Sequence, residues 1–141
     1  MEIKAVQLDL ARQKETVQYV CEFADLLKNW GMNALVLYLE GRVKTKSFPY
    51  KDSEAAYLPE EITAMVQHCK ELDMEVIPVC SSLGHTNMFL SCPELEHLAE
   101  TVGCSEGRFM ESGKLGMMCP SKEEVYSFFD AGALDEHCRG H

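Results

Sequence analysis

The chain has 141 residues, of which 26% are charged and 46% are hydrophobic, a composition typical of an ordinary globular protein. Its 13 Lys and Arg face 23 Asp and Glu, which gives a formal net charge of −10. Because this charge repels a phosphate backbone and an anionic bilayer alike, we expect neither nucleic acid nor membrane as a partner. The sequence has no long apolar run and no leader-like start, so we expect no membrane span and no signal peptide.

The 7 cysteines are odd in number and widely spaced, with no Cys-x-x-Cys pair. This usage is typical of free thiols in a reducing compartment, so we expect a cytoplasmic protein. No His and Cys residues stand at the spacing of a zinc site, and the glycines form no phosphate-binding loop. We therefore expect neither a metal nor a cofactor.

The first predicted elements are a strand over residues 3–10 and a helix over about residues 15–30. The strand residues are mostly apolar and compatible with β-structure. The helix is indicated by apolar residues that repeat on one face, and Gly31 provides its stop. These apolar residues are Val17, Val20, Phe23, Ala24 and Leu27.

Residues 34–39 are continuously apolar, as in a parallel strand covered on both faces. A long polar loop over residues 41–58 follows, and it contains Phe48-Pro49-Tyr50. Pro59 then opens a second helix that extends to about Leu72, because proline is favoured in the first helical turn. The length of the loop predicts a functional or a mobile segment.

Residues 75–79 form a third predicted strand, in which Pro78 marks either the strand end or a ladder position that needs no donor. A loop of small residues over 80–87 follows it. We expect a short helix over about residues 93–100. Ser121 and Glu124 have the spacing of a capping box, which predicts a last helix starting near Lys122.

Strands that alternate with helices predict an α/β fold with a parallel sheet. We expect the three strands to lie side by side in chain order, with the first two helices on one face. A complete eight-unit barrel takes about 250 residues. The chain is therefore either part of such a barrel or a small flavodoxin-like domain, and no phosphate loop supports the second.

Three places follow predicted strands, at the carboxyl edge where α/β folds build their sites. They hold Asp9 with Arg12, Glu40 with Arg42, and Gly84-His85. A carboxylate and an imidazole on neighbouring strand ends can hydrogen-bond and adjust a proton-transferring group. The alternatives are a surface pair of Glu40 with Arg42 and a solvated or backbone-bonded histidine.

Several segments occur in one order and spacing: VQLDLAR at 6–12, GMNALVLYLE at 31–40, FPY at 48–50 with AYLPEEI at 56–62, EVIP at 75–78 and LGHT at 83–86. This succession resembles the first half of the catalytic barrel of glycoside hydrolase family 20, the β-N-acetylhexosaminidases. It is similar to the hexosaminidase D-like branch of that family. The resemblance runs over about residues 3–129.

The resemblance implies a partial (β/α)8 barrel of three to four βα units over residues 1–130, followed by an irregular tail over 131–141. It also implies the release of a terminal β-linked N-acetylhexosamine by retaining hydrolysis, in which the acetamido oxygen of the substrate attacks the anomeric carbon. In the family an Asp orients the acetamido group and the adjacent Glu protonates the leaving oxygen. We expect this Asp-Glu pair, at the end of the fourth strand, to lie beyond the present chain.

The resemblance also assigns roles to residues of this chain. His85 supports the catalytic acid, and Glu40 is oriented towards that histidine, so that the two adjust the pKa of the acid. Lys4 stands where many members have an arginine that binds sugar hydroxyls. Asp9 and Arg12 match a strand-one pattern in which we expect a structural salt bridge below the pocket.

Two functional hypotheses follow. The first is a glycoside hydrolase that acts on a carbohydrate with a terminal N-acetylhexosamine, represented here by the N-terminal part of its barrel. The second is a non-catalytic α/β binding or interaction module derived from such a barrel. In either case the open sheet edge after the third strand predicts self-association.

Overall fold

The computed structural model describes residues 2–45, 56–101 and 116–130. Phe48-Pro49-Tyr50 and the predicted tail over 131–141 lie outside the described residues. None of the helices in the described ranges has the length and apolar character needed to cross a membrane. The elements, in chain order, are β1 (Ala5–Asp9), α1 (Val17–Asn29), β2 (Ala34–Tyr38), α2 (Pro59–Glu71), β3 (Glu75–Val79), α3 (Asn87–Leu90), a 3-10 turn (Glu96–Leu98) and α4 (Glu123–Phe128).

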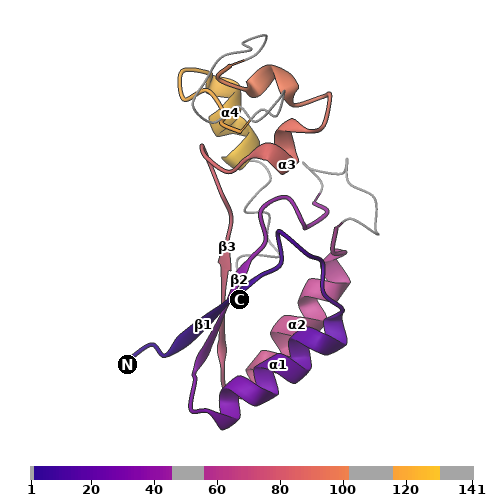
Figure 1. Cartoon of the computed structure of the whole chain (residues 1–141), viewed down its shortest axis with the longest axis vertical. Coiled ribbons are helices and arrows are strands. Elements are labelled where there is room, and N and C mark those ends of the chain that lie inside the picture. Colours follow the sequence, from indigo (N-terminus) through magenta and orange to yellow (C-terminus); the bar gives the residue numbers. More distant parts are fainter. Residues whose placement is uncertain (1, 46–55, 102–115, 131–141) are drawn as a thin grey trace.

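The described strands form one parallel sheet in the order β1-β2-β3. At its carboxyl edge the register aligns Asp9 of β1, Tyr38 of β2 and Val79 of β3 in one row. Helices α1 and α2 lie side by side on the same side of this sheet (Figure 1). The predicted α/β fold, with parallel strands adjacent in chain order, is confirmed.

The main core lies between this sheet and the two helices. α1 contributes Val20, Ala24 and Leu27, all fully buried. They pack in one cluster with Leu35 and Leu37 of β2 and with residues of α2. Since burying one such side chain stabilises a fold by about 1.5–3 kcal/mol, this cluster is what holds the strand ends in place.

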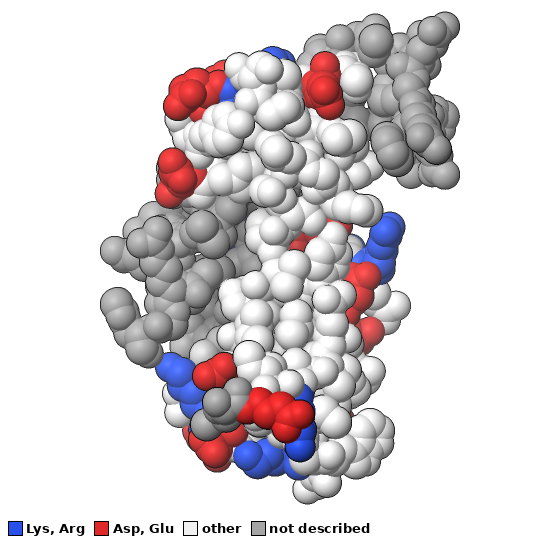
Figure 2. All heavy atoms as spheres, turned by 90° about the vertical axis from the view of Figure 1, so that its left-hand side faces the viewer, with Lys and Arg blue, Asp and Glu red and all other residues white. Residues whose placement is uncertain are grey.

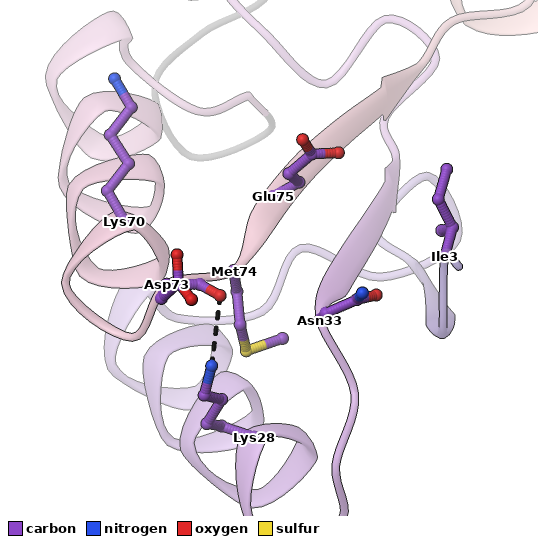
Figure 3. Close-up of a pocket in the computed structure, with 7 residues that line it drawn as sticks. All are labelled: Ile3, Lys28, Asn33, Lys70, Asp73, Met74 and Glu75. Carbon is purple, nitrogen blue, oxygen red and sulfur yellow. Dashed lines mark hydrogen bonds between the residues drawn. The ribbon is translucent and has the colours of Figure 1, made fainter. Parts of the chain in front are cut away.

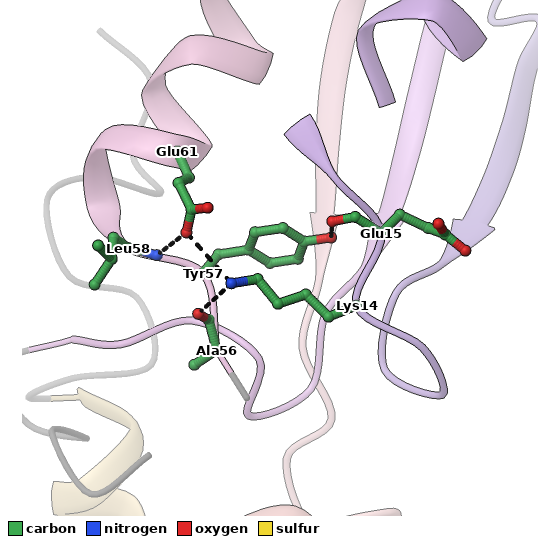
Figure 4. A network of polar contacts seen from close by, with 6 residues as sticks. All are labelled: Lys14, Glu15, Ala56, Tyr57, Leu58 and Glu61. Atoms are coloured by element: carbon green, nitrogen blue, oxygen red, sulfur yellow. Dashed lines mark hydrogen bonds and ion pairs between the residues drawn. The ribbon is translucent and has the colours of Figure 1, made fainter. Parts of the chain in front are cut away.

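The loops above the sheet are tied together by a small polar network (Figure 4). The buried Tyr57 donates its hydroxyl to the carbonyl of Glu15 at 2.7 Å. Lys14 donates to the carbonyl of Ala56 at 2.9 Å and lies 3.6 Å from the carboxylate of Glu61. The loop that leads into α2 is therefore fixed against the loop that leads out of β1.

The chain beyond β3 forms a second apolar cluster around Phe89, Leu98 and Met118. The prediction of a helix over residues 93–100 is wrong, because the backbone instead forms α3 before it and a single 3-10 turn within it. The predicted capping box is also wrong. Lys122 takes the N-cap position of α4 with no side-chain capping bond, and Glu124 reaches His97 at 3.3 Å.

The cysteines in the described ranges carry reduced thiols, namely Cys21, Cys69, Cys80, Cys92 and Cys119. Burial between the helices raises the pKa of the Cys69 thiol to about 11. Because the thiolate is the reactive form, this cysteine acts as a small apolar core residue.

Candidate functional site

Hydroxyl and carboxylate groups meet at the carboxyl edge of the sheet, where β2 and β3 end. The Tyr38 hydroxyl donates to Oε1 of Glu40 at 2.8 Å and lies 2.9 Å from Oγ of Ser81. Since the Tyr38 proton is used on Glu40, the Ser81 hydroxyl is the donor to Tyr38. This chain from Ser81 through Tyr38 to Glu40 joins the ends of two neighbouring strands.

Two of the predicted site residues have a backbone conformation that side chains other than glycine rarely adopt. Glu40 has φ 44° and His85 has φ 55°. Among the described residues other than glycine, Asp73 also has a positive φ, of 53°. It follows the end of α2, where a left-handed residue is a normal helix terminator. Glu40 lies in a turn that the Arg42 N–H closes on the carbonyl of Leu39 at 2.9 Å, a place where positive φ is normal. No helix end accounts for the φ of His85, and left-handed backbone at such a residue is found at functional sites.

The loop that carries His85 is clamped on both sides by a distant part of the chain. Thr86 is fully buried, and both its backbone N–H and its hydroxyl donate to the carbonyl of Gly116, at 3.2 and 3.3 Å. On the other side, the Met118 N–H donates to the carbonyl of Leu83 at 2.9 Å. The surroundings therefore impose the backbone position of His85, while its side chain is exposed.

Electrostatics at this edge keep the Tyr38 hydroxyl protonated. Partial burial raises the pKa of Tyr38 above its usual value of 10.0, the bond from Ser81 lowers it, and the bond to Glu40 raises it again. The negative charges of Glu40 and Asp9 act in the same raising direction. A protonated Tyr38 acts as a fixed donor that orients the Glu40 carboxylate.

The structure places Glu40 and His85 at the same edge, after neighbouring strands. Within the described part of the chain no hydrogen bond or ion pair joins them, and the carboxylate of Glu40 is held by Tyr38. Their cooperation in tuning an acid stays a prediction. Glu40 does not depend on Arg42, whose Nε donates to the carbonyl of Ala11 at 3.1 Å.

Asp9 and Arg12 differ from the expected salt bridge. Oδ1 of Asp9 accepts the backbone N–H groups of Ala11 at 3.0 Å and of Arg12 at 3.2 Å. The carboxylate thus closes the turn that leaves β1, as aspartates commonly do by bonding to backbone two residues on. Asp9 is structural through this turn, while the guanidinium of Arg12 takes no part in it.

Lys4 lies at the other edge of the sheet, before β1 begins. Its Nζ is 3.8 Å from Glu2 and its side chain is more than half exposed. Its backbone N–H donates to the side chain of Asn33 at 2.7 Å. The structure does not bring Lys4 together with Glu40 and His85, so a contact with sugar stays a prediction.

A surface cavity of about 350 Å³ lies at this same amino edge (Figure 3). Figure 3 shows Lys28 reaching Asp73, whose carbonyl it contacts at 3.2 Å. The side-chain amide of Asn33 donates a hydrogen bond to the carbonyl of Glu2 at 2.8 Å. Lys28 and Asn33 at the wall of this cavity are therefore engaged in hydrogen bonds within the chain. The cavity lies at the opposite edge of the sheet from the candidate site.

Sequence reasoning missed Tyr38 and Ser81. Tyr38 stands in a run of apolar strand residues, which gave no sign of a polar role. No known sequence motif surrounds Ser81. One signal pointed to Tyr38, namely a hydroxyl-bearing side chain on the last residue of a strand. Its partners depend on the register of the neighbouring strand, which the sequence does not reveal.

The chain has the fold of part of several solved glycoside hydrolase family 20 structures. The chain superposes with a TM-score of 0.78 on a chitobiase from Flavobacterium johnsoniae, over 97% of this chain and 22% of that one, at 20% identity. It superposes equally well, at 0.78, on a family 20 exo-β-N-acetylglucosaminidase from Vibrio harveyi in complex with N-acetylglucosamine, over 91% of this chain and 24% of that one, at 21% identity. The fold is therefore that of part of a family 20 barrel.

Curated sequences point the same way, although no family model matches the chain. It is 29% identical to hexosaminidase D from Bos taurus over 106 residues, which is 71% of this chain and 29% of that protein. Hexosaminidase D from Homo sapiens is also 29% identical, over 70% of this chain and 21% of that protein. The chain thus spans less than a third of the curated relatives it matches. The chain is distantly similar in sequence to hexosaminidase D, and its fold matches part of the family 20 catalytic barrel.

Proposed function

We propose that the chain supplies the supporting half of a hexosaminidase site, which hydrolyses a terminal β-linked N-acetylhexosamine by a retaining, substrate-assisted route. The observation that carries the proposal is the pair of residues with positive φ, Glu40 and His85, that follow neighbouring strands at the carboxyl edge of a family 20-like sheet. In a barrel this edge is the one that builds the active site.

In this proposal the two residues position a catalytic acid and do not cleave the glycoside themselves. His85 presents an imidazole on a clamped loop, and Glu40 presents a carboxylate fixed by Tyr38. Hydrogen bonding to the imidazole and the nearby carboxylate charge adjust the pKa of an acid placed between sheet and substrate. Such a site needs a further strand that carries the acid and the group that holds the acetamide.

The experiment is a chimaera in which residues 3–129 replace the matching segment of human hexosaminidase D. We expect the chimaera to release 4-nitrophenol from a 4-nitrophenyl β-N-acetylglucosaminide. His85→Ala and Glu40→Gln should each lower kcat/KM by about 100-fold, the cost of a small misplacement of a reacting group. They should also shift the alkaline limb of the pH–rate profile, because both act on the acid, which must be protonated to work.

Glu60→Gln is the matched control, since Glu60 is an exposed carboxylate in the first turn of α2. It should leave the rate and the pH profile unchanged. A folded chimaera that binds N-acetylglucosamine but hydrolyses nothing would favour the non-catalytic binding module. An active chimaera indifferent to His85→Ala and Glu40→Gln would contradict the roles of the two residues.

A further inference from the structure

The hydroxyl of Ser81 lies at the far end of the hydrogen bonds that hold Glu40. Tyr38 is the last residue of β2, and Ser81 comes two residues after the end of β3. The Ser81 and Tyr38 oxygens lie 2.9 Å apart, and the Tyr38 oxygen lies 2.8 Å from Oε1 of Glu40. Both separations are typical of good O–H···O hydrogen bonds. Two consecutive bonds therefore connect a residue beyond β3 with a carboxylate beyond β2.

The carboxylate at one end fixes the order of donors along these bonds. An ionised carboxylate accepts hydrogen bonds and donates none, so the Tyr38 proton goes to Glu40. The Tyr38 oxygen then offers only lone pairs to Ser81, and the Ser81 hydroxyl is the donor. Among the described residues, Oε1 of Glu40 takes this bond and Oε2 takes none. One oxygen of the carboxylate is held, and the other stays open as an acceptor.

The side chain of Tyr38 lies on the face of the sheet that carries no helix. Successive side chains of a strand point to opposite faces, and Leu35 and Leu37 of β2 are buried in the core with the two helices. Tyr38 is one residue out of step with them and so points the other way. In a barrel that face is the interior, and its carboxyl end is where substrates bind.

Hydroxyl groups, and not a cation, hold the Glu40 carboxylate. Within the described part of the chain no ion pair includes Glu40. Arg42, the nearest basic residue in the sequence, donates to the carbonyl of Ala11. Figure 2 shows the side of the molecule on which β1 lies, and there charged side chains gather at the ends and margins while the middle is mostly uncharged. Neutral donors therefore fix the direction of this carboxylate and leave its charge uncompensated.

The groups around the Tyr38 hydroxyl act on its titration in opposite directions. Partial burial raises the pKa of Tyr38, the bond from Ser81 lowers it, and the bond to Glu40 with the charges of Glu40 and Asp9 raises it. The Cys80 thiol lies at the same edge and donates to the backbone carbonyl of Glu40 at 4.0 Å. Removing Ser81 and removing the Glu40 charge should therefore move the Tyr38 titration in opposite directions, which a loss of packing would not do.

We propose, on the basis of the hydrolase function proposed above, that Tyr38 and Ser81 are positioning residues of the same site. Ser81 fixes the Tyr38 hydroxyl, and Tyr38 fixes the Glu40 carboxylate so that its second oxygen is presented as an acceptor. Both residues act through Glu40 and neither takes part in bond cleavage. The site thus includes a residue beyond β3 that precedes the loop of His85.

An NMR titration of the 141-residue chain, with tyrosine labelled by 13C at Cζ, tests the hydrogen bonds themselves. Tyr38→Phe identifies the Tyr38 signal. Ser81→Ala should raise the pKa of Tyr38, because it removes the donor to the phenolate, and Glu40→Gln should lower it, because it removes a negative charge. Ser81→Thr keeps the hydroxyl and should restore the wild-type titration. Ser82→Ala is the matched control, since Ser82 is an exposed serine next to Ser81, and it should change nothing.

The chimaera tests whether Tyr38 acts on the reaction through Glu40. Tyr38→Phe should lower kcat by about 10-fold with little change in KM, because the carboxylate is misplaced while the sugar still binds. It should shift the alkaline limb of the pH–rate profile in the same direction as Glu40→Gln does. The double variant Tyr38→Phe/Glu40→Gln should be no slower than Glu40→Gln alone, because residues that act as a unit are not additive.

A Tyr38 pKa that Ser81→Ala and Glu40→Gln leave unmoved, or move in the same direction, would overturn the inference. In an active chimaera, independent losses from Tyr38→Phe and Glu40→Gln would overturn the positioning role. A wild-type chimaera without activity would contradict the proposed function instead, and the NMR titration would still decide whether Ser81 and Tyr38 hold Glu40.

Discussion

At the scale of single residues, Tyr57 shows how one buried hydroxyl ties two loops together. Its ring is fully buried, and its hydroxyl donates to Glu15. Burial raises the pKa of Tyr57 to about 12, from 10.0 for an ordinary tyrosine. Because the folded value is the higher one, the stabilisation is complete below about pH 10 and is lost as the pH rises through about 12.

We predict that Tyr57→Phe lowers the free energy of unfolding at neutral pH by about 1 kcal/mol, the net value of one hydrogen bond. It should also remove most of the alkaline loss of stability, which for the wild type amounts to about 1.4 kcal/mol at pH 11. Urea unfolding at neutral pH and at about pH 11 measures both effects. Tyr126→Phe, at a 46% exposed tyrosine, should lower the stability less and leave the alkaline loss in place. Equal alkaline losses in Tyr57→Phe and wild type would contradict the assignment.

The candidate site was partly predictable at this scale. Glu40 and His85 could be picked out because a residue directly after a parallel strand lies at the edge where sites form. Ser81 could not be picked out, because its role depends on Tyr38 ending a strand in register with Val79. Asp9 was placed correctly on its strand, but backbone N–H groups two and three residues on compete for its carboxylate more effectively than the distant guanidinium of Arg12 does.

At the scale of elements, two neighbouring leucines of α1 differ in burial. Leu27 is fully buried in the core, and Leu26 is 41% exposed. Leu27→Ala removes buried apolar volume from a packed cluster, for which we predict a loss of about 2–5 kcal/mol in the free energy of unfolding. Leu26→Ala should cost the single chain about 0.5 kcal/mol or less.

Urea unfolding measures this difference. Similar losses for both leucines would mean that α1 is not seated on the sheet by its Val20, Ala24 and Leu27 face.

The helices α1 and α2 were predictable because apolar residues repeat regularly along each of them and a glycine or proline marks one end. α1 ends at Asn29 with Trp30 as its C-cap and Gly31 next at φ 80°, and α2 begins at Pro59. The short elements were not, because their ends are decided by tertiary contacts. At α4, Lys122 donates to the carbonyls of His97 and Ala99, which draws the cap position away from Ser121.

At the scale of the whole molecule, the parallel order of the strands followed from alternating periods and from the handedness of βαβ connections. The repeat of apolar residues along the sequence did not predict the second apolar cluster around Phe89 and Met118. Its contacts join segments more than twenty residues apart, such as Leu83 with Met118, through irregular backbone that has no period. This cluster clamps the loop of His85, so it connects the least predictable part of the fold to the candidate site.

The last prediction concerns the activity of the 141-residue chain by itself. Within the described part of the chain, Glu40 and His85 are positioned to support an acid, and general acid–base help is worth about 10² to 10⁴ in rate only where the acid is in place. We predict no measurable hydrolysis of a chromogenic β-N-acetylglucosaminide by the purified chain, in contrast to the chimaera. Activity lost in His85→Ala would contradict this and would show that the chain supplies its own acid. The sequence holds one Asp-Glu pair, Asp135-Glu136, outside the described residues, and Glu136→Gln would then tell whether that pair is the source.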